Sequence, residues 1–186
     1  MRQYKLVLYP CLPDFTQLES GAIINALKNG GLISGATHHD AFLAGDAFIK
    51  LLSFLGCAPN ICLTPADGEN FCHVIIRPVQ GNIHCLGHTA TAIPRCPHCK
   101  HKIIHWQQTE NWQLGETVCT CSHCNTATAM QNLDWKQECA YGRMAVDIIN
   151  IHPFEAVPSD NLLHILQAAT NVEWSYCYAE HNTNPG

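Results

Sequence analysis

The hydrophobic positions along the chain follow two patterns, which together predict a mixture of strands and helices. Continuous apolar runs of strand length predict strands over residues 4–9, 71–79, 143–151 and 172–180, with a short additional strand at 61–63. Apolar side chains that recur every three or four positions predict helices over residues 16–28, 40–55 and 160–169. The stretch from 80 to 94 is expected to be irregular.

The two ends of the chain repeat one order of predicted elements. Near each end an apolar strand is followed by a proline-containing turn and a capped helix, with Ser159 or Asp160 as the cap of the second helix. Two β-α-β halves that share one sheet would form a ferredoxin-like arrangement. The expected fold class is therefore α+β: a mixed sheet with helices, built from two such halves and carrying an inserted hairpin.

The pattern breaks between residues 93 and 136, where the composition shifts to Cys, His, Trp, Gln and Thr and the apolar runs become short. Such a stretch is expected to be unable to build a core alone, so it needs a cross-link or a metal. We therefore predict a discontinuous α/β core domain formed by residues 1–92 and 137–180, an insertion at 93–136, and a flexible polar tail at 181–186.

Two Cys-x-x-Cys units lie within the predicted insertion, in RCPHCK and in TCSHCN. Each unit places two thiolates on one side of a tight turn, and two such turns face to face supply four sulfurs at tetrahedral corners, the set that zinc prefers. A four-cysteine site has no open position for water or substrate, so the ion is expected to be structural. The predicted ligands of one structural Zn²⁺ are Cys96, Cys99, Cys121 and Cys124.

The insertion resembles a zinc ribbon over residues 93–136. The resemblance implies that KIIHWQQ runs out as a strand, TENWQLGE turns, TVCTC returns to the second cysteine turn and TATAMQNLDW adds a third strand. A glycine often follows each ribbon turn, whereas Lys100 and Asn125 stand there, and lysine tolerates a left-handed backbone less well than asparagine. Alternative ligands close to the two turns are Cys119, His98, His101 and His123.

A second interpretation of the first unit is redox chemistry. Its CPHC tetrapeptide, Cys96 to Cys99, looks like the active site of thiol oxidases of the DsbA type, in which the first Cys lies at a helix N-terminus and has a depressed pKa. The residues that follow, KHKIIHW, predict a strand instead, and a second Cys pair stands at a matching distance. These features favour metal binding over thiol oxidation.

Histidines and an aspartate in the N-terminal half offer a further candidate site, that of a metal-dependent enzyme in which the four cysteines are purely structural. On the helix expected over 40–55, His39 and Asp46 would lie nearly on one face. The sequence has no HExxH zinc-protease pattern, no Gly-rich phosphate loop and no Gly-x-Ser-x-Gly elbow, so no reaction is indicated. The residues that could converge are His38, His39, Asp46, His73, His84 and His88.

Composition and charge favour a binding role over catalysis. Charged residues make up 13% of the chain, about half the usual share, and a poorly charged surface is often covered by a partner. The formal net charge of −5, with ten Lys and Arg scattered along the chain, disfavours nucleic acid. Another protein is therefore the expected partner, with Trp106 and Trp112 either packed over the hairpin or exposed as anchors.

The cysteine content indicates the cellular compartment. Twelve Cys in a chain without a recognisable export signal favour a reducing environment, where paired cysteines are more often metal ligands than disulfides. The longest apolar stretch, AFLAGDAFIKLLSFLG, contains Asp46 and Lys50 and is too short to span a bilayer. A cytoplasmic protein without a membrane segment is expected.

Overall fold

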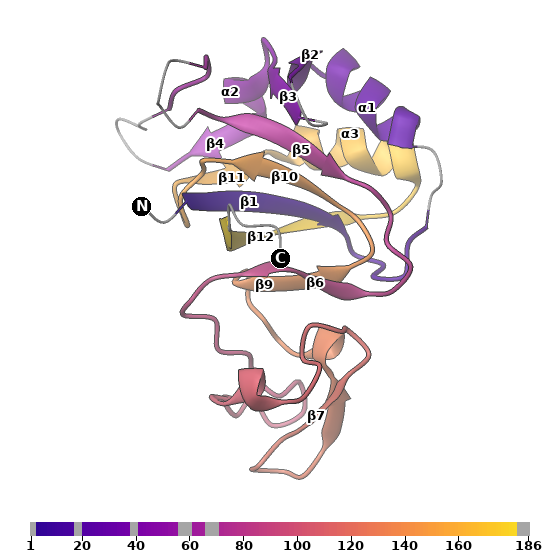
Figure 1. Ribbon diagram of the computed structural model, residues 1–186, viewed down its shortest axis with the longest axis vertical. Helices are drawn as coiled ribbons and strands as arrows, with labels where there is room; N and C mark the ends of the chain where they lie inside the picture. Colours follow the sequence, from indigo (N-terminus) through magenta and orange to yellow (C-terminus); the bar gives the residue numbers. More distant parts are fainter. Residues whose placement is uncertain (1–2, 17–19, 38–40, 56–60, 66–70, 182–186) are drawn as a thin grey trace.

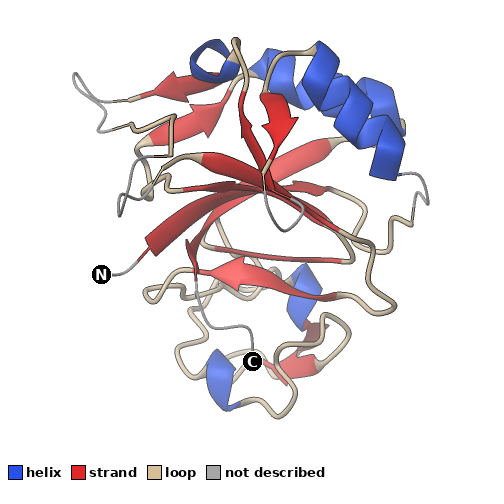
Figure 2. Cartoon of the chain, turned by 45° about the horizontal axis from the view of Figure 1, so that its top comes forward, coloured by secondary structure: helices blue, strands red, loops and turns tan. Residues whose placement is uncertain are grey.

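A large antiparallel sheet separates two helices from the cysteine-rich part of the chain (Figure 1). The computed structural model describes residues 3–16, 20–37, 41–55, 61–65 and 71–181. Helices α1 and α3 lie side by side on one face of the sheet (Figure 2), and a small two-stranded sheet lies against the opposite face. The molecule is thus a mixed α/β structure with few helices.

The main sheet has six antiparallel strands in the order β12-β1-β10-β5-β3-β2. Strand β1 lies next to the edge strand β12 and pairs with β10 on its other side, so that the N-terminal and C-terminal segments are neighbours. In chain order the strands are β1 (Gln3–Pro10), β2 (Ile33–Ala36), β3 (Ala41–Ala44), β5 (His73–Arg77), β10 (Ala145–Ile149) and β12 (Trp174–His181).

The remaining strands of the described residues form three smaller antiparallel sheets of two strands each. One sheet joins β4 to β11 beside the helices, one joins β6 to β9 against the main sheet, and one joins β7 to β8 in the cysteine-rich part. Their bounds are Leu52–Phe54 (β4), His84–His88 (β6), Val118–Thr120 (β7), Ala127–Ala129 (β8), Cys139–Gly142 (β9) and Ala156–Pro158 (β11).

The helices cover the sheet through an aliphatic core. Helix α1 (Ser20–Asn29) and helix α3 (Asp160–Thr170) bury Leu27 and Leu162 completely against strand residues such as Leu6. The Ser159 hydroxyl accepts a hydrogen bond from the Leu162 N–H at 3.3 Å, which caps α3 as predicted. Two short 3₁₀ helices, η1 (Trp106–Gln108) and η2 (Met130–Asn132), and the four-residue α2 (Phe48–Leu51) are the remaining helical segments of the described chain.

The predicted strands at both ends of the chain are confirmed. Their continuous apolar runs are explained by the burial of both faces of the main sheet. Along β1, Leu6 and Leu8 pack under the helices, whereas Val7 and Tyr9 pack toward the β6–β9 sheet. A strand that is buried on both faces reads as a continuous apolar run. The predicted strands at 71–79, 143–151 and 172–180 correspond in the same way to β5, β10 and β12.

The predicted helix over 40–55 is wrong. The described part of this segment forms β3, the single turn of α2 and β4. Strand pairing with β5 and β2 overrides the helical spacing of its apolar side chains. Gly45 lies where the chain leaves β3, and a Cβ placed there would come within 2.4 Å of the Gly31 carbonyl oxygen. The absence of a side chain at Gly45 permits this close contact between the two backbones.

Strands β6 and β9 were not predicted from the sequence. The stretch 80–94 contains β6, which pairs with β9 in an antiparallel register interrupted by a bulge between Cys85 and Gly87. Gly87 has φ +146°, and a Cβ there would lie 2.7 Å from the Cβ of Ala179, so the glycine permits close packing on β12. The short strand expected at 61–63 is absent from the described residues, and the tail from 182 lies outside them.

A buried ion network links the main sheet to β6. Asp147 on β10 is 3% exposed and accepts hydrogen bonds from Lys5 Nζ and Arg77 Nη2, each at 2.8 Å. The same Arg77 Nη2 donates to the Leu86 carbonyl oxygen at 2.7 Å. One carboxylate therefore links three neighbouring strands and orients the arginine that donates a hydrogen bond to β6.

None of the described helices is both long and apolar enough to cross a bilayer.

Candidate metal centre

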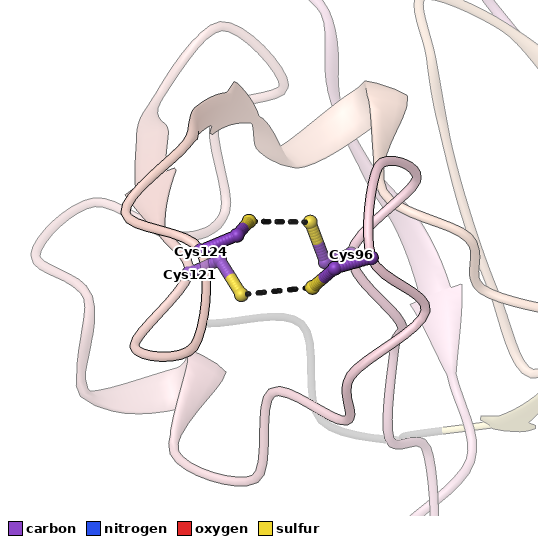
Figure 3. A group of neighbouring side chains, drawn as sticks. Cys96, Cys121 and Cys124 are labelled. Atoms are coloured by element: carbon purple, nitrogen blue, oxygen red, sulfur yellow. Dashed lines mark hydrogen bonds between the residues drawn. The ribbon is translucent and has the colours of Figure 1, made fainter.

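The sulfur atoms of the four predicted zinc ligands, Cys96, Cys99, Cys121 and Cys124, all lie within 4.8 Å of one another. Figure 3 shows the two turns facing each other across this cluster, and the pairs Cys96–Cys124 and Cys99–Cys121 have sulfur separations of 3.7 and 3.6 Å. Four sulfurs at tetrahedral corners around zinc, with bonds of about 2.3 Å, are separated by about 3.8 Å. The cluster therefore has the size and donor chemistry of a four-cysteine metal site.

The two cysteine turns have the same backbone geometry. The Lys100 N–H donates to the Cys96 carbonyl at 2.9 Å, and the Asn125 N–H donates to the Cys121 carbonyl at the same distance. Lys100 and Asn125 have φ values of 60° and 56°, so both adopt the left-handed conformation that glycine often supplies. Lysine in this position raises the conformational free energy of the turn but leaves its hydrogen bonds intact.

Each turn is closed by one further backbone hydrogen bond. The Cys96 N–H donates to the His101 carbonyl at 2.9 Å, and the Cys121 N–H donates to the Thr126 carbonyl at 3.0 Å. The second turn lies at the tip of the hairpin formed by β7 and β8. The first turn is anchored instead by Arg95, whose backbone forms isolated bridges to Lys102 and to Asp134.

The first predicted strand of the hairpin, KIIHWQQ, is wrong as a strand. Within it only Lys102 forms a bridge, and the segment then turns into the 3₁₀ helix at Trp106. The hairpin in the structure connects β7 to β8 around the second cysteine turn, so TVCTC and the start of TATAMQNLDW pair with each other. The tryptophan at position 106 explains the difference, because its burial in an aromatic cluster draws the chain away from β7.

The surroundings of one sulfur, that of Cys124, favour the thiolate, whereas contacts with the neighbouring thiols raise the pKa of Cys99 to about 12. Cys96 and Cys121 are buried, and Cys99 and Cys124 are half-buried. The Thr126 hydroxyl lies 3.3 Å from Cys124 Sγ. Hydrogen bonds from the side chain and backbone of Thr126 lower the pKa of Cys124 to about 6. A metal ligand must be deprotonated, so this contact favours the binding form of the thiol.

The alternative ligands do not join the cluster. Cys119 is 6% exposed and packs into the aromatic cluster beside it. The rings of His101 and His123 stack on each other with centroids 4.9 Å apart, which connects the two turns from outside the sulfur set. His98 is exposed. The regular spacing of the Cys-x-x-Cys units thus identified the four sulfurs that converge.

An aromatic cluster lies beside the sulfurs and combines residues of this segment with residues from outside it, such as Ile83 and Tyr141. The Trp106 ring meets those of Trp112 and Trp135 edge to face, with centroids 4.9 and 4.8 Å apart. Trp106 is 3% exposed and donates from Nε1 to the Ala92 carbonyl. Tyr141 of β9 completes the cluster and donates to the Trp112 carbonyl at 2.8 Å. The packed role of Trp106 is thereby established.

The histidine and aspartate set of the metal-enzyme hypothesis does not converge among the described residues. His73, His84 and His88 each lie near a backbone carbonyl within two residues in sequence, at 3.1, 3.3 and 2.9 Å respectively. Asp46 is exposed and does not lie on the predicted helix. His38 and His39 lie outside the described residues. In the described ranges the four cysteines are the group with metal-binding geometry.

The arrangement of CPHC also differs from that of a thiol oxidase. Cys96 is followed by a hydrogen-bonded turn and not by a helix, and both thiols of CPHC belong to a cluster with Cys121 and Cys124 rather than forming an isolated pair. Cys96 therefore does not lie at a helix N-terminus, the position of the first Cys in oxidases of the DsbA type. The contacts favour a four-sulfur cluster.

Two features of the neighbourhood gave no signal in the sequence. Arg95 exchanges backbone hydrogen bonds with Asp134 at 2.9 and 3.0 Å, which ties the first turn to the segment that follows β8. Cys85 and Cys139 have no regular spacing, yet their sulfurs lie 3.8 Å apart across the β6–β9 sheet. Both contacts join residues far apart in sequence, which no local motif encodes.

Comparisons of the chain with protein-family models, with curated proteins and with solved structures found no match.

Proposed function

We propose that the protein binds one structural Zn²⁺ through Cys96, Cys99, Cys121 and Cys124 and uses the part of the chain ordered by this ion as a binding module for another protein. The observation that carries the proposal is the convergence of four sulfurs within 4.8 Å. Four thiolates fill the tetrahedral coordination of zinc, so the site leaves no position for a substrate. The ion would stabilise a surface rather than perform chemistry.

We infer that the segment 93–136 is an inserted unit of zinc-ribbon type. Its support is the pair of equivalent cysteine turns, one of which stands on the β7–β8 hairpin. For the remaining chain, we infer a ferredoxin-like core. The strand order β12-β1-β10-β5, with α1 after β1 and α3 before β12, is that of two interleaved β-α-β halves.

A binding surface is supported by the apolar side chains that this segment exposes. Ile104 is 64% exposed and Val118 is 56% exposed, whereas the tryptophans beside them are packed. In Figure 1 the segment containing β7 projects from the side of the molecule opposite the helices. The net charge of −5 favours a protein partner over nucleic acid.

A photo-crosslinking experiment tests the module. A photoreactive residue is placed at Ile104 in the zinc-loaded full chain, and a matched variant carries it at Ile49, which is 46% exposed on α2. Crosslinked proteins from an extract of the source cells are identified by mass spectrometry. We expect a defined protein to be crosslinked from Ile104 but not from Ile49, and to be lost when Cys96→Ser is added. Equal crosslinking from both positions, or capture retained in Cys96→Ser, would contradict the module.

A further inference from the structure

We propose that the free edge of β7 binds an extended peptide of alternating acidic and apolar residues by strand addition, in a groove between β7 and residues 101–105. The inference rests on the proposed binding function and specifies the class of partner. Strand addition uses unpaired backbone groups of an edge strand for affinity and side-chain pockets for selectivity.

The backbone of β7 presents such groups. In an antiparallel ladder, alternate residues bond to the partner strand and the others point away from it. The Cys121 N–H donates to the Thr126 carbonyl and the Met130 N–H donates to the Thr117 carbonyl, which fixes the residues that bond to β8. Val118 and Thr120 occupy the alternate positions of this register. Their N–H and C=O groups therefore point away from β8.

The opposite wall of the groove repeats this arrangement. The His101 carbonyl and the Ile103 N–H bond to the segment 94–96, at 2.9 Å each, around the isolated bridge of Lys102 to Arg95. The N–H and C=O of Lys102 thus point away from that segment. Across the part of the chain that the structure describes, they form no backbone hydrogen bond. Unpaired backbone groups therefore occur on both walls.

The groove between these walls has a volume of about 360 Å³ and is lined by both polar and apolar side chains. Its lining includes Ile103, Ile104 and Val118, and the last two are the most exposed aliphatic side chains of the wall residues. The groove lies where the sequence predicted that KIIHWQQ would pair directly with TVCTC. The two segments do not pair, so the edge of β7 remains open.

The charges that line the groove select the partner. His101, Lys102 and His105 contribute to the wall, and no lining residue among those described carries a carboxylate. The local charge is therefore opposite in sign to the net charge of −5 of the chain. In a strand, alternate side chains face opposite sides. A peptide with acidic residues on one face and β-branched apolar residues on the other would meet the basic side chains and the exposed aliphatic ones.

Fluorescence anisotropy of the zinc-loaded full chain tests the proposal with a labelled twelve-residue peptide of alternating Glu and Val. We expect saturable binding, which is weakened at least about tenfold for an alternating Lys and Val peptide because like charges would face each other. Methylation of alternate backbone nitrogens of the Glu–Val peptide should abolish binding, because it removes the donors needed for pairing. A single-stranded oligonucleotide that competes as well as the peptide would overturn the choice of partner.

Two proline variants separate pairing from fold. Val118→Pro removes an N–H that faces the groove without removing a bond to β8, and it should weaken the peptide about tenfold or more. Ala129→Pro is the matched control. Ala129 lies opposite Val118 on β8, its N–H points to the other edge, and its φ of −63° already suits proline. Equal affinity of both variants for the peptide would overturn strand addition.

The charge requirement has a matched pair as well. Lys102→Glu should weaken the Glu–Val peptide, whereas Lys50→Glu, an equal charge change at the exposed end of α2, should not. Failure of the peptide to bind at all, with crosslinking from Ile104 intact, would overturn the peptide class and leave the binding module standing. A different result is also informative: crosslinking from Ile104 is lost, but the peptide still binds and Val118→Pro still weakens it. This result would contradict the binding module and would leave the peptide-binding groove standing.

Discussion

The main sheet and the cysteine-rich segment are stabilised by different means. The sheet buries aliphatic side chains from strands and helices in one large cluster, in which residues such as Leu6, Val146 and Leu166 are fully buried. In the segment 93–136 the strands are three residues long, and the buried cluster consists mainly of aromatic rings, sulfurs and methionine. The comparison indicates that hydrophobic burial specifies the first region, whereas the second combines a smaller aromatic cluster with four sulfurs that could hold a metal ion.

The two regions also differ in how their backbone N–H and C=O groups are hydrogen-bonded. Six strands form a continuous ladder in the main sheet. In the cysteine-rich segment, backbone hydrogen bonds within turns outnumber those of the short β7–β8 ladder. Of the seven described non-glycine residues with positive φ, four lie within this segment. Turns of this kind have little cooperative support from neighbouring strands, so we predict that their order depends on a metal ion held by the four cysteines.

Removal of zinc is the change with the largest expected effect, and it should separate the two regions. Structural zinc contributes about 10 kcal/mol or more to the folding of small zinc domains. A chelator should therefore expose Trp106, Trp112 and Trp135 and remove hydrogen-exchange protection from 93–136, while α1, α3 and the main sheet keep theirs. Tryptophan fluorescence and hydrogen exchange measured by mass spectrometry report this difference.

The matched variants for this prediction are Cys96→Ser and Cys11→Ser. Cys96 belongs to the sulfur cluster, whereas Cys11 is exposed and lies outside it. Cys96→Ser should reproduce the effect of the chelator, and Cys11→Ser should leave both regions unchanged. A chelated protein that keeps full protection at 93–136 would show that the aromatic cluster suffices without an ion.

Asp147→Asn should be the most destabilising single change in the main sheet. The carboxylate is 3% exposed and bonds to Lys5 and Arg77, so its loss leaves two cations without their partner. Breaking a buried ion pair costs about 3 to 5 kcal/mol of the free energy of unfolding. Chemical denaturation of the zinc-loaded protein, followed by far-UV circular dichroism, measures the change.

Asp134→Asn is the corresponding control in the cysteine-rich segment. Asp134 pairs with Lys136 at 3.2 Å and with Lys100 at 3.9 Å, and both lysine side chains are more than half exposed. Such surface pairs are worth less than about 1 kcal/mol. If both aspartate variants lost the same stability, the contrast between a buried network and a surface pair would be wrong.

Trp135→Phe should cause a moderate and local loss. The indole Nε1 donates to the Met130 carbonyl at 2.7 Å, and the ring packs against Trp106 and Tyr141. Losing the hydrogen bond and part of the ring volume costs about 2 kcal/mol. Zinc release by a competing chelator should become faster, because the segment opens more often. Trp174→Phe, in the main core, should leave the release rate unchanged.

Lys100→Gly should have the smallest effect and the opposite sign. Lys100 has φ 60°, where a side chain strains the backbone by about 1 kcal/mol and glycine does not. The variant should bind zinc slightly more tightly, as measured by competition with a chromophoric chelator. The control is Lys136→Gly, at φ 61° outside the two turns. A weaker zinc affinity in Lys100→Gly would mean that the Lys100 side chain itself supports the site.

Local signals in the sequence predicted the parts of the molecule that depend on local chemistry. The apolar run of β1, the cap of α3 and the four cysteines are each encoded within a few neighbouring residues, and the structure contains the strand, the helix and the sulfur cluster. The spacing of Cys-x-x-Cys carries this information because the two thiols of one turn must face the same way.

Long-range pairing explains what the sequence did not predict. Segment 41–54 has helical spacing but becomes two strands and a single helical turn, because β5 and β11 offer it partners. Strand β6 contains two histidines and a bulge at Gly87, so its sequence lacks a regular strand pattern. Its pairing with β9, which is distant in sequence, makes it a strand. The ionic contacts of Asp147 join residues separated by more than 60 positions, and no periodicity records them.

X-ray absorption spectroscopy with elemental analysis of the purified full chain tests the central claim most directly. Our account predicts one zinc per chain with four sulfur neighbours at about 2.3 Å. A protein that contains no zinc, or a zinc ion with nitrogen or oxygen in place of any sulfur from Cys96, Cys99, Cys121 or Cys124, would contradict it.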